Sequence, residues 1–500
     1  MNELPKGVLK SRRDADAIER IDVEAVNKTE RRQLYKKREP IYPKLVHGHF
    51  RALKWAVMAM TLGVYYGLPW LRWDRGPGEP SQAVLVDFTG RRFYFFFIEI
   101  WPNEIYYITG LLILAALALF LVTSLFGRVW CGYACPQTVW TDLYIAVERL
   151  IEGDRNARIR LAKEGWATGK FAKKIIKHAL WLLIAAATGG AWIFYFHDAP
   201  TVFPEIFIGH APATAYVFLG ILTFTTYALA GTMREQVCTY MCPWPRIQAA
   251  LTDEDALSVT YRRDRGEPRG PHRKGDSWEG HGDCIDCAQC VAACPMGIDI
   301  RDGDQLECIN CALCIDACNS IMKKVGRPQN LIAYDTLKNV TRRSSGQSAV
   351  YRFVRARTIF YAIGILVVAG IMLLALTHKR TIDLSVGRDR NPAFVRLSDG
   401  SVRNGYSIRV ENRAPRTARF AVRVESKISF EMKAVGIVPE TGPIEFPLKS
   451  GEDRTLRVYL TQKAGPAAQA APLPLEIEVI NLGTGEERSE KTTFLSGAQP

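Results

Sequence analysis

Twelve cysteines occur in this sequence, in a spacing regular enough to indicate metal or redox chemistry. Eight of them form two runs of the pattern C-x2-C-x2-C-x3-C, from Cys284 to Cys294 and from Cys308 to Cys318. A 4Fe-4S cube needs four thiolates that converge on its corners. Three cysteines of one tight turn can reach the same cube, whereas the fourth, three residues later, is expected to cross over to the other cube.

This interleaving assigns the eight cysteines to two ligand sets. The first set is Cys284, Cys287, Cys290 and Cys318, and the second set is Cys294, Cys308, Cys311 and Cys314. Interleaved ligands place two cubes close together, which suits electron transfer between them. A pair of zinc ribbons is the alternative, but ribbons use two C-x2-C pairs without the C-x3-C continuation.

The remaining cysteines lie in two C-x3-C-P motifs and are called the quartet: Cys131, Cys135, Cys238 and Cys242. If the preceding helix continues, residues i and i+4 share one face, and the following proline ends the helix. Four such thiols could bind a soft ion such as Cu(I), hold a further cluster, cycle as dithiols, or simply pack the helix ends. The repeat of the motif favours chemistry over packing.

Five apolar runs supply the framework that must position these cysteines. Each is long enough to cross about 30 Å of hydrocarbon and is predicted to be a transmembrane helix. The first follows a polar stretch without a cleavage site, so it is expected to be an anchor and not a signal peptide. The runs are Leu53–Leu71, Ile105–Phe126, Ala179–Phe196, Ala215–Gly231 and Thr358–Thr377. The first four form two hairpins, each ending in a C-x3-C-P motif.

Lysine and arginine crowd the N-terminal arm around Arg31 to Arg38 and the segments 128–177 and 234–357, which the positive-inside rule places in the cytoplasm. The connection 197–214 has neither residue and is expected to face outward. All twelve cysteines lie on the cytoplasmic side, where thiols stay reduced. The net charge of +14 is explained by these flanks, and no nucleic-acid-binding motif accompanies it.

The expected fold is an α-helical membrane protein with five transmembrane helices, an inserted two-cluster bacterial-ferredoxin-like domain and a C-terminal Ig-like β-sandwich. The tail predicts about seven strands because short runs alternate apolar and polar residues between turn residues. The expected parts are a cytoplasmic arm (1–48), the two hairpins (49–250), a linker (251–282), the ferredoxin-like domain (283–325), a second linker (326–357), the fifth helix (358–378) and a periplasmic sandwich (379–500).

This order of parts resembles the cytochrome c oxidase accessory protein family of FixG and CcoG type, from about Arg38 to the end. The cysteine motifs alone would also fit the polyferredoxin subunits of periplasmic nitrate and nitrous-oxide reductase systems. The fifth span and the Ig-like tail favour the oxidase accessory family.

The resemblance implies a cupric reductase of the bacterial inner membrane, which reduces Cu(II) to Cu(I) for assembly of a C-family (cbb-type) haem-copper oxidase. It makes the quartet the catalytic, copper-binding thiols and the two 4Fe-4S clusters the electron store. Its implied partners are oxidase subunits or a copper chaperone or transporter, with an electron donor that the sequence does not identify. Two other hypotheses are a quinol-linked electron carrier to a periplasmic reductase and a non-enzymatic assembly scaffold.

Overall fold

The computed structural model of the chain divides into two compact units, Met1–Met372 and Leu373–Pro500. It describes residues 20–27, 39–76, 79–165, 167–272, 276–378, 380–414, 416–426, 428–437, 444–463 and 472–495. The basic residues from Arg31 to Arg38, on which the cytoplasmic arm was predicted, lie outside the described residues.

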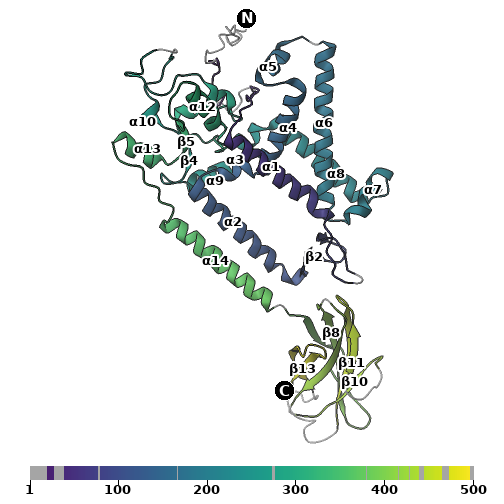
Figure 1. Ribbon diagram of the computed structural model, residues 1–500. Coiled ribbons are helices and arrows are strands. Elements are labelled where there is room, and N and C mark those ends of the chain that lie inside the picture. The colour runs from purple at the N-terminus through teal and green to yellow at the C-terminus, as the bar shows by residue number, and fades with distance from the viewer. Residues whose placement is uncertain are drawn as a thin grey trace. The chain divides into compact units, whose positions relative to one another are not determined.

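Among the described residues, four helices are long and apolar enough to cross a membrane, which is compatible with a membrane protein (Figure 1). They are α2 (Tyr106–Phe126), α6 (Thr168–Ile193), α8 (Ala213–Thr226) with its continuation η4 (Tyr227–Met233), and α14 (Ala356–Thr377). These four match four of the five predicted runs. Helix α14 packs along α2, with Tyr361 beside Phe120 and Gly364 beside Leu117.

The fifth predicted span is not confirmed. Its residues form α1 (His49–Gly67), followed by the short turn η2 (Leu68–Trp70), and α1 is not among the four helices. The first turns of α1 carry Arg51 and Lys54, whose side chains are buried against Asp142. The first turns of α1 therefore lie in a polar interior, and the apolar part after Lys54 is about 24 Å long at 1.5 Å per residue.

The first C-x3-C-P motif is not a continuation of the preceding helix, contrary to expectation. Helix α2 ends at Phe126, and Gly127, with φ +57°, turns the chain into the short helix α3 (Val129–Tyr133). Pro136 then opens a new helix, α4 (Pro136–Glu152), where its missing N–H is no loss. Helix α5 (Arg155–Lys163) follows. Cys131 and Cys135 therefore lie on different elements.

The second motif begins inside the second of two π-helical segments, η4 and η5 (Val237–Met241), and ends just before α9 (Trp244–Leu251). Cys238 lies in η5 and Cys242 directly after it. π-Helical turns inside α-helices often mark functional sites, because they shift the face on which the following side chains lie.

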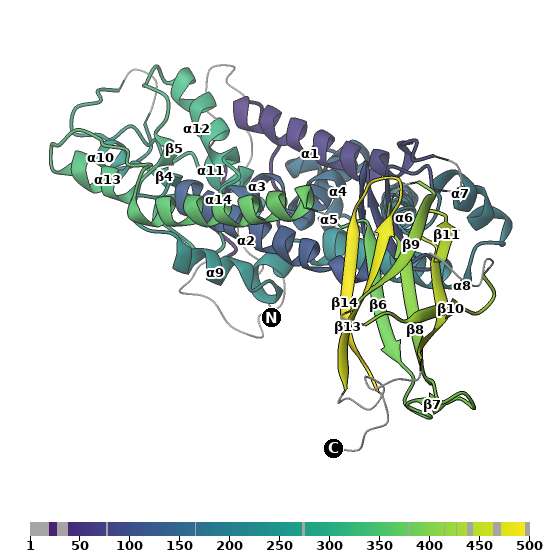
Figure 2. The same ribbon diagram turned by 90° about the horizontal axis from the view of Figure 1, so that it is seen from below.

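The ferredoxin-like part consists of short helices around the cysteine loops, at one end of this unit (Figure 2). Its elements are β4 (Ser258–Tyr261), α10 (Arg263–Gly266), α11 (Gln289–Ala293), η6 (Ile300–Asp302), α12 (Leu313–Lys324), β5 (Ile332–Asp335) and α13 (Leu337–Ser344). Strand β4 pairs antiparallel with β5, and Val259, Tyr261 and Ile332 are buried beside the cysteines. The two stretches expected to be linkers thus contribute a sheet to this part.

The described residues of the N-terminal arm also pack here. Val26 and Asn27 donate backbone hydrogen bonds to Gly297, Lys44 donates one to Ala292, and Ala25 is buried in the same core. The sequence predicted only a cytoplasmic arm here, whereas the backbone groups of its described residues find partners on the cysteine loops.

A small sheet and a short helix lie between the apolar helices. The sheet has the order β1 (Val84–Asp87), β2 (Arg92–Phe95), β3 (Ile98–Ile100), all antiparallel, followed by η3 (Pro102–Glu104). The helix is α7 (Ala199–Ile208), in the basic-free connection 197–214. This sheet was not predicted from the sequence.

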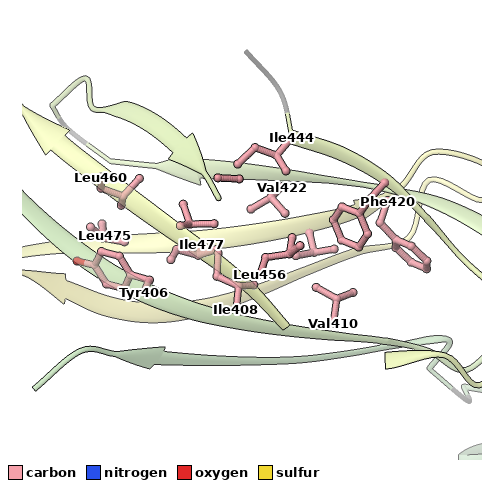
Figure 3. Close-up of a cluster of buried hydrophobic side chains, with 14 of the residues drawn as sticks. Tyr406, Ile408, Val410, Phe420, Val422, Ile444, Leu456, Leu460, Leu475 and Ile477 are labelled. Atoms are coloured by element: carbon pink, nitrogen blue, oxygen red, sulfur yellow. The ribbon is translucent and has the colours of Figure 1, made fainter. Parts of the chain in front are cut away.

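The second unit is the expected β-sandwich. Its described residues form two sheets, with the orders β10-β12-β8-β6, where β7 also pairs with β8, and β11-β9-β13-β14. Alternate residues such as Tyr406, Ile408 and Val410 point inward and meet Phe420 and Val422 of the facing sheet (Figure 3). The strands are β6 (Ile382–Arg388), β7 (Val395–Arg396), β8 (Val402–Asn412), β9 (Ala418–Glu425), β10 (Glu431–Ala434), β11 (Ile444–Leu448), β12 (Asp453–Gln462), β13 (Leu473–Asn481) and β14 (Glu487–Phe494).

Candidate functional site

The four cysteines of the first set line one cavity, together with Tyr261, Arg301 and apolar side chains of α12 and β5. Cys318, from the second run, lies close enough to Cys287 and Cys284 for their charges to raise its pKa further, after the larger effect of burial. Cys290 is buried, and burial raises its pKa well above the usual value. The fold therefore brings the crossing cysteine to the three cysteines of the other run.

The second set converges in the same way. Cys294, Cys308, Cys311 and Cys314 line a second cavity with Ile298, Ile300 and Ile309. Burial raises the pKa of Cys308 to about 12, and neighbouring Cys311 and Cys294 add to the rise. Cys290 of the first set also lines this cavity, so the two sets are adjacent.

The loops around both sets are shaped to hold an anionic group. Asp286 and Ala288, which flank Cys287, have φ of +49° and +53°, and Asn310 and Ala312, which flank Cys311, have φ of +53° and +60°. Left-handed residues of this kind turn successive backbone N–H groups into a concave anion-binding surface. N–H groups of Met296, Gly297 and Ile298 point at the sulfur of Cys294. These loops fit 4Fe-4S clusters, whose thiolate sulfurs accept such hydrogen bonds.

One cation, which the cysteine pattern did not predict, lies beside the first set. Arg301 lines its cavity, and the positive charge of Arg301 opposes the pKa rise that burial causes in Cys290. Asp299 and Asp286 hold Arg301 at 2.7 and 2.6 Å. The only sequence feature that could have indicated this role is the position of Arg301 in the loop between the two cysteine runs.

The structure also brings the quartet together, from two separate hairpins. Burial is the main cause that raises the pKa of Cys131 and of Cys238 to about 12. The negative charges of Cys135 and Cys242 raise both pKa values further. The Cys131 thiol donates to Oε1 of the buried Gln248 at 3.1 Å. Cys242 is exposed.

Gln137 and Thr138, at the start of α4, hold the backbone around the quartet by side-chain hydrogen bonds. Gln137 Nε2 donates to the carbonyls of Leu229 (2.8 Å) and Arg234 (3.2 Å), which precede the second motif. Thr138 Oγ1 donates to the Cys131 carbonyl at 2.6 Å. Cys135 is the N-cap of α4, and the backbone N–H groups of Gln137 and Thr138 lower its pKa against the larger raising effect of burial. A helix N-terminus favours a thiolate.

The quartet lies directly against the second set. A Cβ atom on Gly132 would stand 2.6 Å from the carbonyl oxygen of Ile309, so only glycine allows α3 to approach the Cys308–Cys311 loop this closely. Arg128 donates to the carbonyls of Cys308 (3.3 Å), Pro245 (2.9 Å) and Leu306. Cys131 and Cys238 pack on the same apolar cluster as Cys294 and Cys308.

Sulfur spacing separates single-ion sites from cluster sites. Among the described residues, no three His, Cys, Asp or Glu side chains are placed to hold one metal ion. One tetrahedral ion with metal–sulfur bonds of about 2.3 Å requires its sulfurs to lie roughly 3.8 Å apart, whereas a cube holds them farther apart.

A buried charge network on α4 is a further feature that sequence reasoning missed. Glu148 accepts from Arg158 at 2.8 Å and Arg234 at 3.0 Å, and Glu152 pairs with Lys177 at 3.0 Å. Asp142 pairs with Arg51 of α1 at 2.9 Å. The sequence pattern that could have indicated this network is the set of acidic residues on α4, Asp142, Glu148 and Glu152, beside basic neighbouring segments.

Three family models match this chain. A 4Fe-4S binding domain matches residues 108–152, a 4Fe-4S dicluster domain matches residues 233–337, and a domain described as the Ig-like fold at the C-terminal of FixG matches residues 372–497. Iron-sulfur binding and the Ig-like tail are thus confirmed at the level of the domain, whereas no match indicates copper.

Two curated relatives align over nearly the whole chain. Protein RdxB of Cereibacter sphaeroides is 50% identical over 93% of this chain and 98% of its own length. Nitrogen fixation protein FixG of Rhizobium meliloti is 49% identical over 91% of this chain and 92% of its own. A solved FixG-related protein from Vibrio parahaemolyticus covers 23% of this chain and 97% of its own, at 18% identity and a TM-score of 0.19, too low to carry an argument. The full-length identity and the matching domains together show that this chain belongs to the FixG-type family.

Proposed function

We propose that this chain is an iron-sulfur electron-transfer protein of the bacterial inner membrane that reduces Cu(II) to Cu(I), supplying copper for assembly of a cbb-type oxidase. The observation that carries the proposal is the line of cysteines from the buried first set, through the second set, to the exposed Cys242 of the quartet. Such a line connects a protected electron store to the protein surface.

The surface end of this line suits a soft metal ion. A cavity beside the quartet is lined by Cys238, Met241, Cys242 and Glu307, and both Met241 and Cys242 are exposed. Thiolate and thioether sulfur favour Cu(I) over Cu(II), so an incoming Cu(II) would be easier to reduce at this place. When bound, 4Fe-4S clusters supply one electron at a time, which matches the single electron that each Cu(II) takes up.

The proposed topology keeps five spans. In it α1 crosses the membrane with Arg51 and Lys54 neutralised by Asp142 inside the protein, and the tail lies in the periplasm. The proposed partners are oxidase subunits or a copper chaperone or transporter that collects Cu(I), and an electron donor on the cytoplasmic side. The quartet cysteines are the proposed catalytic residues, and the eight cysteines of the two sets the proposed cluster ligands.

The test is a reduction assay under anaerobic conditions. The purified full chain is reduced with dithionite, desalted, and mixed with Cu(II) and a Cu(I)-specific chelator, while cluster absorbance and chelator colour are recorded together. We expect the clusters to reoxidise in proportion to the Cu(I) formed, one electron for each copper. Protein that was never reduced is the control. Clusters that stay reduced in the presence of copper would contradict the proposal and favour the quinol-linked or the scaffold hypothesis.

A further inference from the structure

We infer that a cavity beside Cys308 of the second set binds a quinol, and that this quinol is the electron donor of the two clusters. The cavity has a volume of about 340 Å³ and lies between the end of α2, the end of α9 and the loop that precedes Cys308. The inference goes beyond copper reduction. It names the donor that the proposed function leaves open, and it holds whichever acceptor takes the electrons.

Size and access are the first support. Cavities that bind small organic molecules in proteins have volumes of roughly 300 to 1,000 Å³. The cavities inside the first and second sets have volumes of only about 20 Å³ each. Cys308 lines both the large cavity and the cavity of the second set. An electron from a molecule bound in the large cavity therefore has only the Cys308 side chain to cross.

The lining is the second support, because it combines apolar groups with hydrogen-bond acceptors. Leu306 and Leu337 supply apolar surface, and Glu254 and Asp304 supply carboxylates. Neither carboxylate has an ion pair or a hydrogen bond with another residue that the structure describes. A flat ring with two hydroxyl groups suits this lining, because its faces pack on the leucines while its hydroxyls donate to the carboxylates.

The charge of the cavity disfavours other small electron donors. Asp253, Glu254 and Asp304 line it, against the single cation of Arg128, which already donates to three backbone carbonyls. The phosphates of nicotinamide and flavin nucleotides would be repelled here. Among the described residues, no three ligating side chains are placed to hold a metal ion. The lining therefore favours an uncharged organic molecule.

The position of the cavity is the third support. Gly127, which directly follows α2, lines it, as does Asp253, which pairs with Arg355 immediately before α14. Arg355 also donates to the carbonyl of Ser124 in α2. Both α2 and α14 are long and apolar enough to cross a membrane. A donor with its ring in the cavity can thus keep an apolar tail in the bilayer, which is the build of a quinol.

The electrons and protons of this step balance. A quinol that becomes a quinone breaks two O–H bonds and releases two electrons and two protons. Each 4Fe-4S cluster takes up one electron, so the two clusters together accept both. Cys290 lines the cavities of both sets, which provides the passage from the second set to the first. Glu254 and Asp304 are exposed, so protons that they accept can leave to water.

The first experiment measures reduction of the clusters without copper. The oxidised full chain in detergent is mixed anaerobically with decylubiquinol in large excess over decylubiquinone, and cluster absorbance is followed. We expect bleaching, as dithionite produces, and no bleaching by NADH. Because copper is absent, a negative copper reduction assay would leave this result standing. A negative result here would likewise leave the copper proposal standing.

Two variants locate the reaction in the cavity. Ala249→Trp fills it from an exposed position on α9, and Glu254→Gln/Asp304→Asn removes both carboxylates. We expect each to slow bleaching by quinol about tenfold, through lost space or lost hydrogen bonds. Bleaching by dithionite should be unchanged, which shows that the clusters are intact. Asp302→Asn, on an exposed carboxylate of the same loop outside the cavity, is the matched control and should react like the unchanged protein.

Photolabelling supplies a binding measurement that needs no electron transfer. The full chain is irradiated with an azido derivative of the same quinone, and the labelled peptides are mapped. We expect label within residues 249–258 and 304–310, and its loss in Ala249→Trp. Quinol that leaves the clusters oxidised, in protein that dithionite bleaches, would overturn the inference. Equal rates of bleaching by quinol in Ala249→Trp and the unchanged protein, or label confined to other segments, would overturn it as well.

Discussion

At the scale of single residues, the first prediction concerns the fourth cysteine of each run. We expect Cys318 to bind the cluster of the first run and Cys294 the cluster of the second. If Cys318 belongs with Cys284, the double variant Cys284→Ser/Cys318→Ser should lose no more iron than either single variant, because both changes remove the same cluster. The double variant Cys308→Ser/Cys318→Ser should lose two clusters. Iron analysis and EPR of the four proteins distinguish these patterns. The reverse pattern, with two clusters lost in Cys284→Ser/Cys318→Ser and one lost in Cys308→Ser/Cys318→Ser, would show that the fourth cysteine of each run does not cross.

Arg128 should tune the reduction potential of the centres beside it. Its guanidinium is partly buried, near Cys131 and bonded to the carbonyl of Cys308, and its positive charge favours the reduced, more negative cluster. Over about 10 Å and an effective dielectric constant of about 20, a unit charge contributes roughly 1.7 kcal/mol, or about 70 mV for one electron.

We therefore expect Arg128→Gln to lower the midpoint potential of the nearest cluster, measured by redox titration followed by EPR. Arg128→Lys keeps the charge and should restore most of the potential, while losing part of the carbonyl bonding. A Gln variant with unchanged potential and full iron content would mean that Arg128 only fastens α3 to the Cys308 loop.

Local spacing was enough to predict which cysteines lie together in the two sets, because that grouping follows from distances along a tight turn. It was not enough to predict the quartet as one site. That depends on the contacts of Gln137 with Leu229 and Arg234, about 90 residues apart, which no local pattern encodes. Arg301 and Gln248 were missed for the same reason, since their importance comes only from what they touch in the fold.

At the scale of elements, α4 is the part whose buried charges hold the cysteine-bearing segments together. Burial alone would raise the pKa of Glu148, but Arg234, Arg158 and Lys177 outweigh it and hold the pKa below its ordinary value of 4.5. A carboxylate with a lowered folded pKa stabilises the fold above its unfolded pKa, and this contribution is lost as the pH falls through the folded pKa.

Glu148→Gln should therefore destabilise the protein at pH 7, by about 3 to 5 kcal/mol because three cations lose their buried partner. The difference from the unchanged protein should begin to shrink near the unfolded pKa of about 4.5 and disappear only as the pH falls further, through the lowered folded pKa of Glu148. Thermal unfolding of both proteins in detergent from pH 7 to about pH 3 measures this. Glu164→Gln, on an exposed residue, is the control and should change little. A difference that is constant over this range would mean that the charge of Glu148 contributes nothing.

The apolar runs and the alternating tail predicted most elements to within a few residues, because period and length are local properties. The failures have a common cause. The break between α2 and α4, the sheet of β4 and β5, and the packed N-terminal segment all depend on backbone groups that find partners far along the chain. Polar composition predicted a linker at 251–282, but Val259 and Tyr261 are buried there.

At the scale of the whole molecule, the side of the membrane on which the tail lies depends on one helix. The four confirmed long apolar helices are an even number, so without α1 the two ends of the chain would lie on the same side. The apolar part of α1 after Lys54 is short of 30 Å, yet Trp70 and Trp73 follow it, and aromatic residues of this kind sit at membrane interfaces.

An enzyme reporter that is active only in the periplasm, fused after residue 495, should therefore be active. Reporters fused after residue 76 and after residue 165 test the same helix directly, and we expect the first to be active and the second inactive. An inactive C-terminal fusion together with an inactive fusion after residue 76 would mean that α1 lies on the cytoplasmic side. The sandwich would then lie in the cytoplasm, on the opposite side of the membrane from the cysteines that precede α14, and a role for it in binding a periplasmic partner would be excluded.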